Sequence, residues 1–248
     1  MKSVSLGTAW KEAQEFMQRE AGLLIPVALL FIAIPLALMM QAIPPELRHV
    51  KVEQGAAPPQ VPFYPVFIMF GASLIILGGM LTIYALALKP GISLKEAVTL
   101  GFRRMGISLG ASLIVGGAML LPLAIAGAIS PTLAATVTLL VVLAVSARML
   151  MLNAIVIDRP VGIIQALKDS WAFSKGNVAK LLLFVIAIII PIMLAQAVCE
   201  MGFGLAGTAI GGPDLGWRLG AVGGSIALAL GQMVMAVMTA RIYRQVAG

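Results

Sequence analysis

Six long apolar runs dominate this chain and restrict what it can fold into. They cover residues 21–43, 65–88, 107–129, 133–157, 181–203 and 219–240. Each run is close to the roughly 20 residues with which an α-helix crosses about 30 Å of hydrocarbon, and a helix satisfies its own backbone polar groups there. The sequence therefore predicts an all-α, polytopic membrane protein, with residues 1–248 forming one integral membrane domain that has six transmembrane helices.

The third and fourth runs are separated only by a predicted tight turn at Ser130 and Pro131. No residue from Met105 to Ala147 is charged, and this stretch is long enough for two spans. We therefore expect six spans and not five.

Basic residues are concentrated in alternate connections between the runs. Of the 17 Lys and Arg residues, three lie before the first run, four in the second connection, four in the fourth connection and two in the tail. The other connections contain only Arg48, Lys51 and Arg218, and Arg148 lies inside a run. Because cytoplasmic loops carry the excess of Lys and Arg, we expect both termini in the cytoplasm and the protein in a bacterial cytoplasmic (inner) membrane.

Composition excludes a soluble domain and argues against a nucleic-acid partner. Hydrophobic residues make up 60% and charged residues 11% of the chain, too little polar surface to cover a soluble protein of this length. The net charge of +7 is divided among four juxtamembrane segments and mixed with acidic residues. Anionic lipid headgroups are therefore the expected counter-ions, and no nucleic acid is expected.

Three cytoplasmic connections place apolar residues at helical spacing, which predicts three amphipathic helices on the membrane surface. We expect Ser93 to cap the second, and Asp158 to cap the third, with Pro160 in its first turn and Gly176 as its stop. Each surface helix has an alanine 25 or 26 residues before a proline of the following run: Ala9 and Pro35, Ala97 and Pro122, Ala166 and Pro191. This spacing predicts a threefold repeat of surface helix, span and span; the alternative is chance alignment of apolar sequence.

Arg148 is the one basic residue inside an apolar run. An ionised guanidinium there is costly unless it is paired, hydrated or near the interface. It is a candidate for binding a lipid phosphate or a polar ligand, together with Asn153 and Asp158. The alternative is a structural ion pair with Asp158 or Glu20, or a carbonyl cap for a surface helix.

Gln196 and Glu200 lie one helical turn apart near the outer end of the fifth run, so they share a face. They could line a polar entrance, or Glu200 could reach the external headgroups.

Aromatic and basic residues of the surface helices form a candidate interfacial contact layer. Its members are Trp10, Phe102, Lys168, Ser170, Trp171, Lys175 and Lys180.

The sequence offers little for catalysis. His49 is the only histidine, so neither a histidine-based metal site nor a catalytic triad is expected. Cys199 is the only cysteine, which excludes an intrachain disulfide. We expect no enzyme activity, no cofactor and no bound metal.

Residues 153–183 contain an ordered motif. Three aliphatic residues are followed by an acidic residue, then by an alanine, a Ser-Trp pair and a final Gly-Asn pair. The matching residues are Ile155, Val156, Ile157, Asp158, Ala166, Ser170, Trp171, Gly176 and Asn177. This pattern resembles the membrane-domain family of glycerophosphoryl diester phosphodiesterases and related six-span bacterial membrane proteins, in which an arginine often stands where Arg148 does. In that family a separate soluble barrel with a metal site does the catalysis, and residues 1–248 contain no such segment. The resemblance implies a six-span membrane domain and no activity.

Two functions fit these expectations. The first is a non-enzymatic membrane protein that organises anionic lipid, or docks a membrane-protein partner, through its basic amphipathic helices. The alternative is a small transporter or lipid-handling permease with a polar site formed by Arg148, Asn153 and Gln196.

Overall fold

The computed structural model describes residues 4–44 and 63–247, and every regular element in these ranges is a helix. The elements are α1 (Leu6–Ala28), the π-helical turn η1 (Leu29–Ala33), α2 (Ile34–Gln41), α3 (Phe63–Leu88), α4 (Leu94–Ile129), α5 (Pro131–Met149), α6 (Leu152–Asp158), α7 (Ile163–Ser174) and α8 (Val178–Ala247). Five continuous helical stretches are long and apolar enough to cross a membrane: Leu6–Gln41, Phe63–Leu88, Leu94–Ile129, Thr132–Asp158 and Val178–Ala247. The prediction of an all-α chain with several membrane-length helices is confirmed. Most of the predicted connection between the first two runs, residues 44–64, lies outside the described residues.

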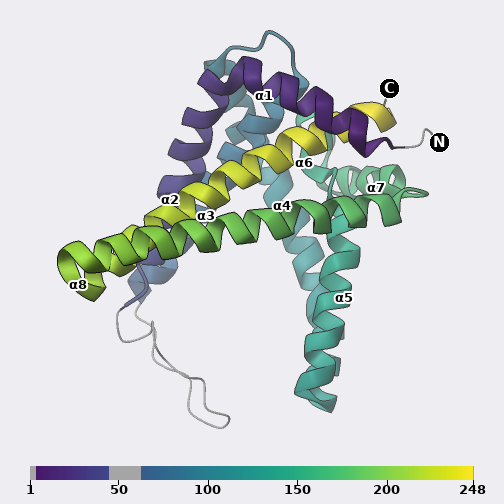
Figure 1. Cartoon of the computed structure of the whole chain (residues 1–248). Helices are drawn as coiled ribbons and strands as arrows, with labels where there is room; N and C mark the ends of the chain where they lie inside the picture. Colours follow the sequence, from purple (N-terminus) through teal and green to yellow (C-terminus); the bar gives the residue numbers. More distant parts are fainter. Residues whose placement is uncertain (1–3, 45–62, 248) are drawn as a thin grey trace.

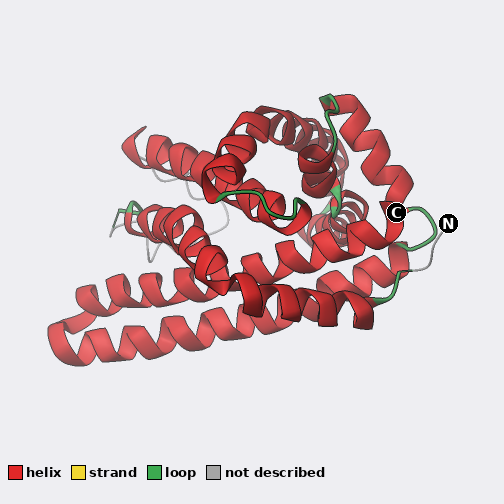
Figure 2. Ribbon diagram, turned by 90° about the horizontal axis from the view of Figure 1, so that it is seen from above, coloured by secondary structure: helices red, strands yellow, loops and turns green. Residues whose placement is uncertain are grey.

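The last of these stretches, α8, reverses direction at two glycines. Gly211 has φ −144° and ψ 20°, and Gly212 has φ 81° and ψ −175°, a backbone conformation that favours glycine. Figures 1 and 2 show the two halves of α8 running side by side. The fifth apolar run was predicted to end at residue 203, but the helix continues beyond it up to the two glycines.

Glycines allow the two halves of α8 to pack closely. A Cβ added at Gly207 would lie 2.8 Å from the Leu215 carbonyl oxygen and 2.9 Å from the Gly216 Cα. A Cβ at Gly220 would lie 3.0 Å from the Glu200 carbonyl oxygen. Small residues that let helix backbones approach are the usual packing device in membranes. The two halves therefore form one helical hairpin, here named the α8 arm.

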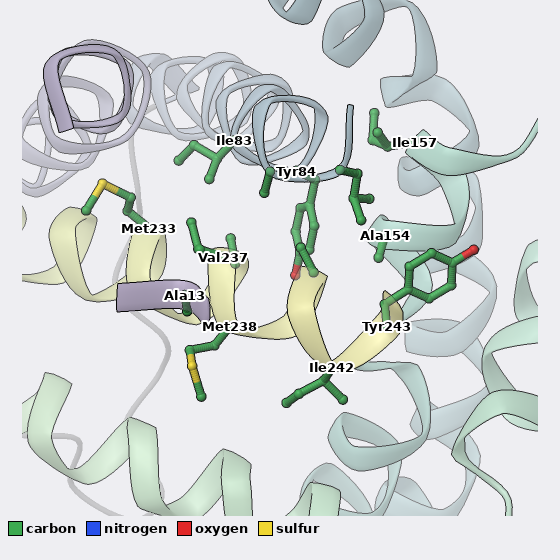
Figure 3. Close-up of a cluster of buried hydrophobic side chains, with 14 of the residues drawn as sticks. Ala13, Ile83, Tyr84, Ala154, Ile157, Met233, Val237, Met238, Ile242 and Tyr243 are labelled. Atoms are coloured by element: carbon green, nitrogen blue, oxygen red, sulfur yellow. The ribbon is translucent and has the colours of Figure 1, made fainter. Parts of the chain in front are cut away.

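A buried apolar cluster joins α1, α3, α6 and the end of α8, and we call this region, together with α7, the hub. Figure 3 shows Tyr84 and Tyr243 with Ile83, Val237 and Ile242 in this cluster. All five are at most 4% exposed. Deleting such a side chain typically costs about 2–5 kcal/mol, so the hub is the stable centre from which the long helices extend.

The α8 arm and the hairpin of α4 and α5, here the α4–α5 arm, leave the hub in different directions (Figure 1). Their apolar surfaces are exposed: only 6% of the most apolar window of α4 and 17% of that of α8 is buried. The exposed large apolar residues of the arms include Leu113, Leu120, Leu121, Leu139, Leu140, Leu183, Met193, Leu194 and Leu205. Surfaces of this composition match lipid hydrocarbon and not water.

Two of the three predicted surface helices are not separate elements. α1 continues through η1 into α2, and α4 runs for 36 residues, which at 1.5 Å per residue extends over about 54 Å. Only α7 stands apart, since Gly176 with φ 82° ends it as predicted. The predicted cap of α4 is confirmed: the Ser93 side chain accepts from the Glu96 amide, and the Ser93 amide donates to the Glu96 carboxylate at 2.9 Å.

The fourth apolar run is broken near Arg148. Helix α5 begins at the expected turn, with Ser130 as its N-cap and Pro131 in its first turn, and ends at Met149. α6 follows after two residues and is almost entirely buried in the hub. The predicted run at 133–157 is found as the membrane-length stretch Thr132–Asp158, but its helix is interrupted at residues 150 and 151, and the seven residues of α6 pack against protein.

Candidate functional site

Arg148, Ser170 and Trp171 form one contact unit where α7 lies against the end of α5. The Arg148 guanidinium carbon lies 4.6 Å from the centroid of the Trp171 ring, a cation–π contact. The Ser170 hydroxyl donates a 2.9 Å hydrogen bond to the Arg148 carbonyl oxygen. Because the helix ends at Met149, this carbonyl has lost its helical partner, and Ser170 replaces it.

The partners predicted for Arg148 are wrong. Among the described residues, Glu20 pairs with Arg19 at 3.0 Å, and Asp158 lies 3.8 Å from Arg159. An aromatic ring and not a carboxylate contacts the guanidinium. The Arg148 Nη1 atom is buried and has no hydrogen-bond partner in the described part of the chain.

Asp158 belongs to a second network, between the end of α6 and the end of α8. The Tyr243 hydroxyl donates a 2.8 Å hydrogen bond to Asp158 Oδ2. Arg159 stacks on the Phe173 ring at 5.2 Å, and Phe173 meets Tyr243 edge to face. The expected N-cap role is wrong, because Asp158 is the last residue of α6 and Gly162 caps α7.

The predicted first turn of α7 is corrected in the same region. Pro160 lies in the connection before the helix, which begins at Ile163. The segment is extended at Arg159, with φ −120° and ψ 147°, as the residue before a proline prefers.

Asn153 also serves packing. The Ser108 hydroxyl donates a 2.6 Å hydrogen bond to Asn153 Oδ1, which links α4 to α6. Such hydrogen bonds between helices are typical of polar residues in membrane proteins.

Gln196 and Glu200 share a face as predicted, and this face is the inside of the α8 arm. A Cβ at Gly224 would lie 3.2 Å from Glu200 Oε2 and 3.6 Å from the Gln196 Cγ. The structure therefore places Gln196 and Arg148 in different interfaces, and does not assemble the proposed site of Arg148, Asn153 and Gln196.

The candidate contact layer is only partly exposed. Trp10 is 47% and Trp171 52% exposed. Phe102 does not belong to this layer, because its ring meets Phe31 at 5.8 Å between α4 and η1. Ser170 is also wrong as a contact residue, since it is fully buried.

The predicted lysines of the layer differ in their role. Lys168 and Lys175 are exposed on and just after α7. Lys180 is exposed too, but its ammonium group donates to the Val4 carbonyl oxygen at 3.4 Å. Lys180 therefore helps to hold the N-terminal segment against the hub.

Sequence reasoning missed a second stacked arginine, Arg241. Its guanidinium lies 4.5 Å from the centroid of the Phe16 ring, and the residue is only 8% exposed. Gln245 exchanges two hydrogen bonds with the Ser5 backbone, at 3.0 and 3.2 Å. The sequence could have identified Arg241 by its position directly after an apolar run, just as it identified Arg148 by its position within one.

Apolar grooves run along the arms and end at the tryptophans. The groove of the α4–α5 arm has a volume of about 430 Å³ and is lined by Val115, Met119, Pro122, Val145, Lys168 and Trp171, among others. The groove of the α8 arm has a volume of about 550 Å³ and is lined by Trp10, Ile188, Pro191, Ala195, Cys199 and Ile226, among others. In the described part of the chain no charged residue lines the α8 groove.

Within residues 4–44 and 63–247, no cluster of three or more His, Cys, Asp or Glu side chains is placed to hold a metal ion. Comparison of the chain with protein-family models, with curated proteins and with solved structures gave no match. The functional argument therefore depends on the geometry above.

Proposed function

We propose that the protein is a non-enzymatic, six-span protein of a bacterial cytoplasmic membrane, whose basic hub faces the cytoplasm and binds and organises anionic phospholipid. The two halves of α8 supply the fifth and sixth spans. The beginning of α1 and the end of α8 both lie at the hub (Figure 1), on the side to which the positive-inside rule assigns the cytoplasm. Anionic lipids of the cytoplasmic leaflet attract such juxtamembrane bases.

The observation that carries this proposal is the composition of α7. Its protein-facing residues, Ala166 and Ser170, are fully buried, whereas Ile164 is 55% and Trp171 52% exposed. Lys168 is exposed on the same helix. A helix that leaves apolar, indole and basic side chains uncovered together is suited to the boundary between headgroups and hydrocarbon.

Two features that recur in each unit support the proposed threefold repeat. Ala9, Ala97 and Ala166 are all fully buried. The prolines that follow them each line an apolar groove: Pro35 between α2 and α3, Pro122 in the α4–α5 arm and Pro191 in the α8 arm. The residues that carry the family resemblance, Arg148, Ser170 and Trp171, form one of the helix contacts of this repeat.

The structure gives less support to a transporter than to a lipid-binding protein. Gln196 and Glu200 pack inside the α8 arm, while Arg148 and Asn153 make contacts with α7 and α4. No shared polar site connects these residues, so the geometry favours lipid binding over transport.

Lipid copurification tests the proposal. The variant Lys168→Glu/Lys175→Glu reverses two exposed charges and leaves the contact between Lys180 and Val4 intact. Each removed base near an anionic surface is worth about 1 kcal/mol, or about fivefold in affinity, so phosphatidylglycerol retained per protein should fall by at least tenfold. Arg218→Glu, at the exposed tip of the α8 arm, is the control and should retain wild-type lipid.

Equal lipid retention in the hub variant and in wild type would refute the proposal. Loss of a copurifying protein with unchanged lipid would instead favour docking of a partner.

A further inference from the structure

The α4–α5 groove combines an apolar channel with a positive charge at one end. Val115, Met119, Pro122 and Val145 line it within the arm, and Lys168 closes it at α7. The exposed surface around it belongs to helices of membrane length. A groove that faces hydrocarbon and is lined in this way accommodates an acyl chain better than water.

The tryptophan at the hub end of the groove contacts an arginine. Trp171 lines the groove, and Arg148 stacks on its ring at 4.6 Å. An indole is favoured at the level of the lipid headgroups, where one side is apolar and the other polar. The ring therefore marks the depth at which an acyl chain in the groove joins its headgroup.

One cation lines this end of the groove, and a second contacts its tryptophan. Lys168 lines the groove and has an exposed side chain, whereas Arg148 is not a lining residue and stacks on the Trp171 ring. The adjacent acid, Asp169, accepts a 2.6 Å hydrogen bond from Gln165 along the same helix. A phosphate is a group that complements the Lys168 charge at this end of the groove.

We infer that the α4–α5 groove is a binding site for one anionic phospholipid, with an acyl chain along α4 and α5 and the phosphate next to Lys168. This inference rests on the proposed function and adds a discrete site to it. The α8 groove is the natural comparison, because it has a tryptophan, a proline and a larger volume but no charged lining residue in the described part of the chain. It accepts acyl chains without selecting the headgroup.

Fluorescence quenching by lipids with brominated acyl chains tests the site. The full-length variant Trp10→Phe/Trp217→Phe retains only Trp171, and Trp171→Phe/Trp217→Phe retains only Trp10. Each is reconstituted with brominated phosphatidylglycerol or brominated phosphatidylcholine of identical chains. Half-maximal quenching of Trp171 should require about fivefold less phosphatidylglycerol than phosphatidylcholine, the effect of one positive charge, whereas Trp10 should be quenched equally by both.

Matched variants separate the site from the general basic surface. In the Trp171-only protein, Lys168→Gln should abolish the headgroup preference, and Lys175→Gln, which removes an exposed lysine that does not line the groove, should retain it. Filling the groove by Ala118→Phe should reduce quenching by both lipids.

Three results would overturn the inference. Equal quenching of Trp171 by both lipids in the protein that retains Lys168 would show that the groove does not select the headgroup. Equal effects of Lys168→Gln and Lys175→Gln would also contradict a discrete site, but they would leave the proposed function intact. Absence of quenching by either lipid, together with dimers of the protein, would assign the groove to a second copy of the chain. Failure of the proposed function itself would appear in a separate experiment, as wild-type lipid copurification with the Lys168→Glu/Lys175→Glu variant.

Discussion

Replacement of Gly207 by alanine tests whether backbone contact holds the two halves of the α8 arm together. The new Cβ would lie 2.8 Å from the Leu215 carbonyl oxygen, about 0.6 Å short of ordinary van der Waals contact. The three nearest atoms, the Leu215 oxygen and carbonyl carbon and the Gly216 Cα, all belong to the backbone, so the contact cannot be relieved by movement of a side chain. The helices must separate, and overpacking of this kind costs about 1–3 kcal/mol.

Gly202→Ala is the matched control for Gly207→Ala. It lies five residues earlier in the same helix, is exposed, and has no atom within 4 Å of the added Cβ. Both variants gain the same helix propensity, up to about 1 kcal/mol. The difference between their free energies of unfolding in detergent micelles therefore isolates the contact and should reach about 1–3 kcal/mol. Equal stability of the two variants would refute the close packing of the arm.

Two further substitutions test the hub, and a third tests the N-cap of α4. Arg148→Leu removes the cation stacked on Trp171 and should destabilise the docking of α7 by about 0.5–2 kcal/mol. Amide hydrogen exchange in α7 should then be faster than in wild type, and an unchanged exchange rate would argue against the contact. Tyr243→Phe removes the 2.8 Å hydrogen bond to Asp158, and chemical unfolding should show a loss of about 1.5–3 kcal/mol; a neutral effect contradicts the network. Ser93→Ala should cost about 1 kcal/mol through loss of the α4 cap, whereas Ser93→Asp should retain the stability measured in the same assay.

The membrane-length helices were predictable because hydrophobic length is a one-dimensional property of the sequence. The run at 65–88 matches α3 (Phe63–Leu88) closely, and the turn at Ser130 and Pro131 was identified from residue types alone. Local chemistry also sufficed for the cap at Ser93 and the stop at Gly176.

The points that sequence reasoning missed depend on contacts between distant segments. The break after Met149 reflects the packing of α6 into the hub, which no local pattern reveals. Asp158 looked like a helix cap, but its partner Tyr243 lies 85 residues away. Phe102 has the spacing of a surface aromatic, yet Phe31 on another helix covers its ring.

The residues of the candidate site were also predictable one by one, but their contacts were not. The sequence identified Arg148, Ser170 and Trp171 individually, and the structure joins them in one contact. The position of Arg148 inside an apolar run predicted that it needs a partner, but charge alone pointed to a carboxylate. An aromatic partner on a neighbouring helix could be found only from the fold.

The crossing of one bilayer by both arms is the central requirement of the account. The arms diverge in Figure 1, and membrane helices tilt by up to about 40° from the bilayer normal, so both arms cross only if they tilt in opposite directions. The alternative is that one arm lies along the membrane surface, with its tip on the same side as the hub.

Cysteine labelling of oriented vesicles distinguishes these arrangements. In a Cys199→Ser background, single cysteines replace Ser130 at the tip of the α4–α5 arm, Pro213 at the tip of the α8 arm, and Lys175 at the hub. With right-side-out vesicles and a membrane-impermeant maleimide, the account predicts labelling at positions 130 and 213 in intact vesicles, and at position 175 only after lysis. Labelling of either tip only after lysis, or of position 175 in intact vesicles, would contradict it.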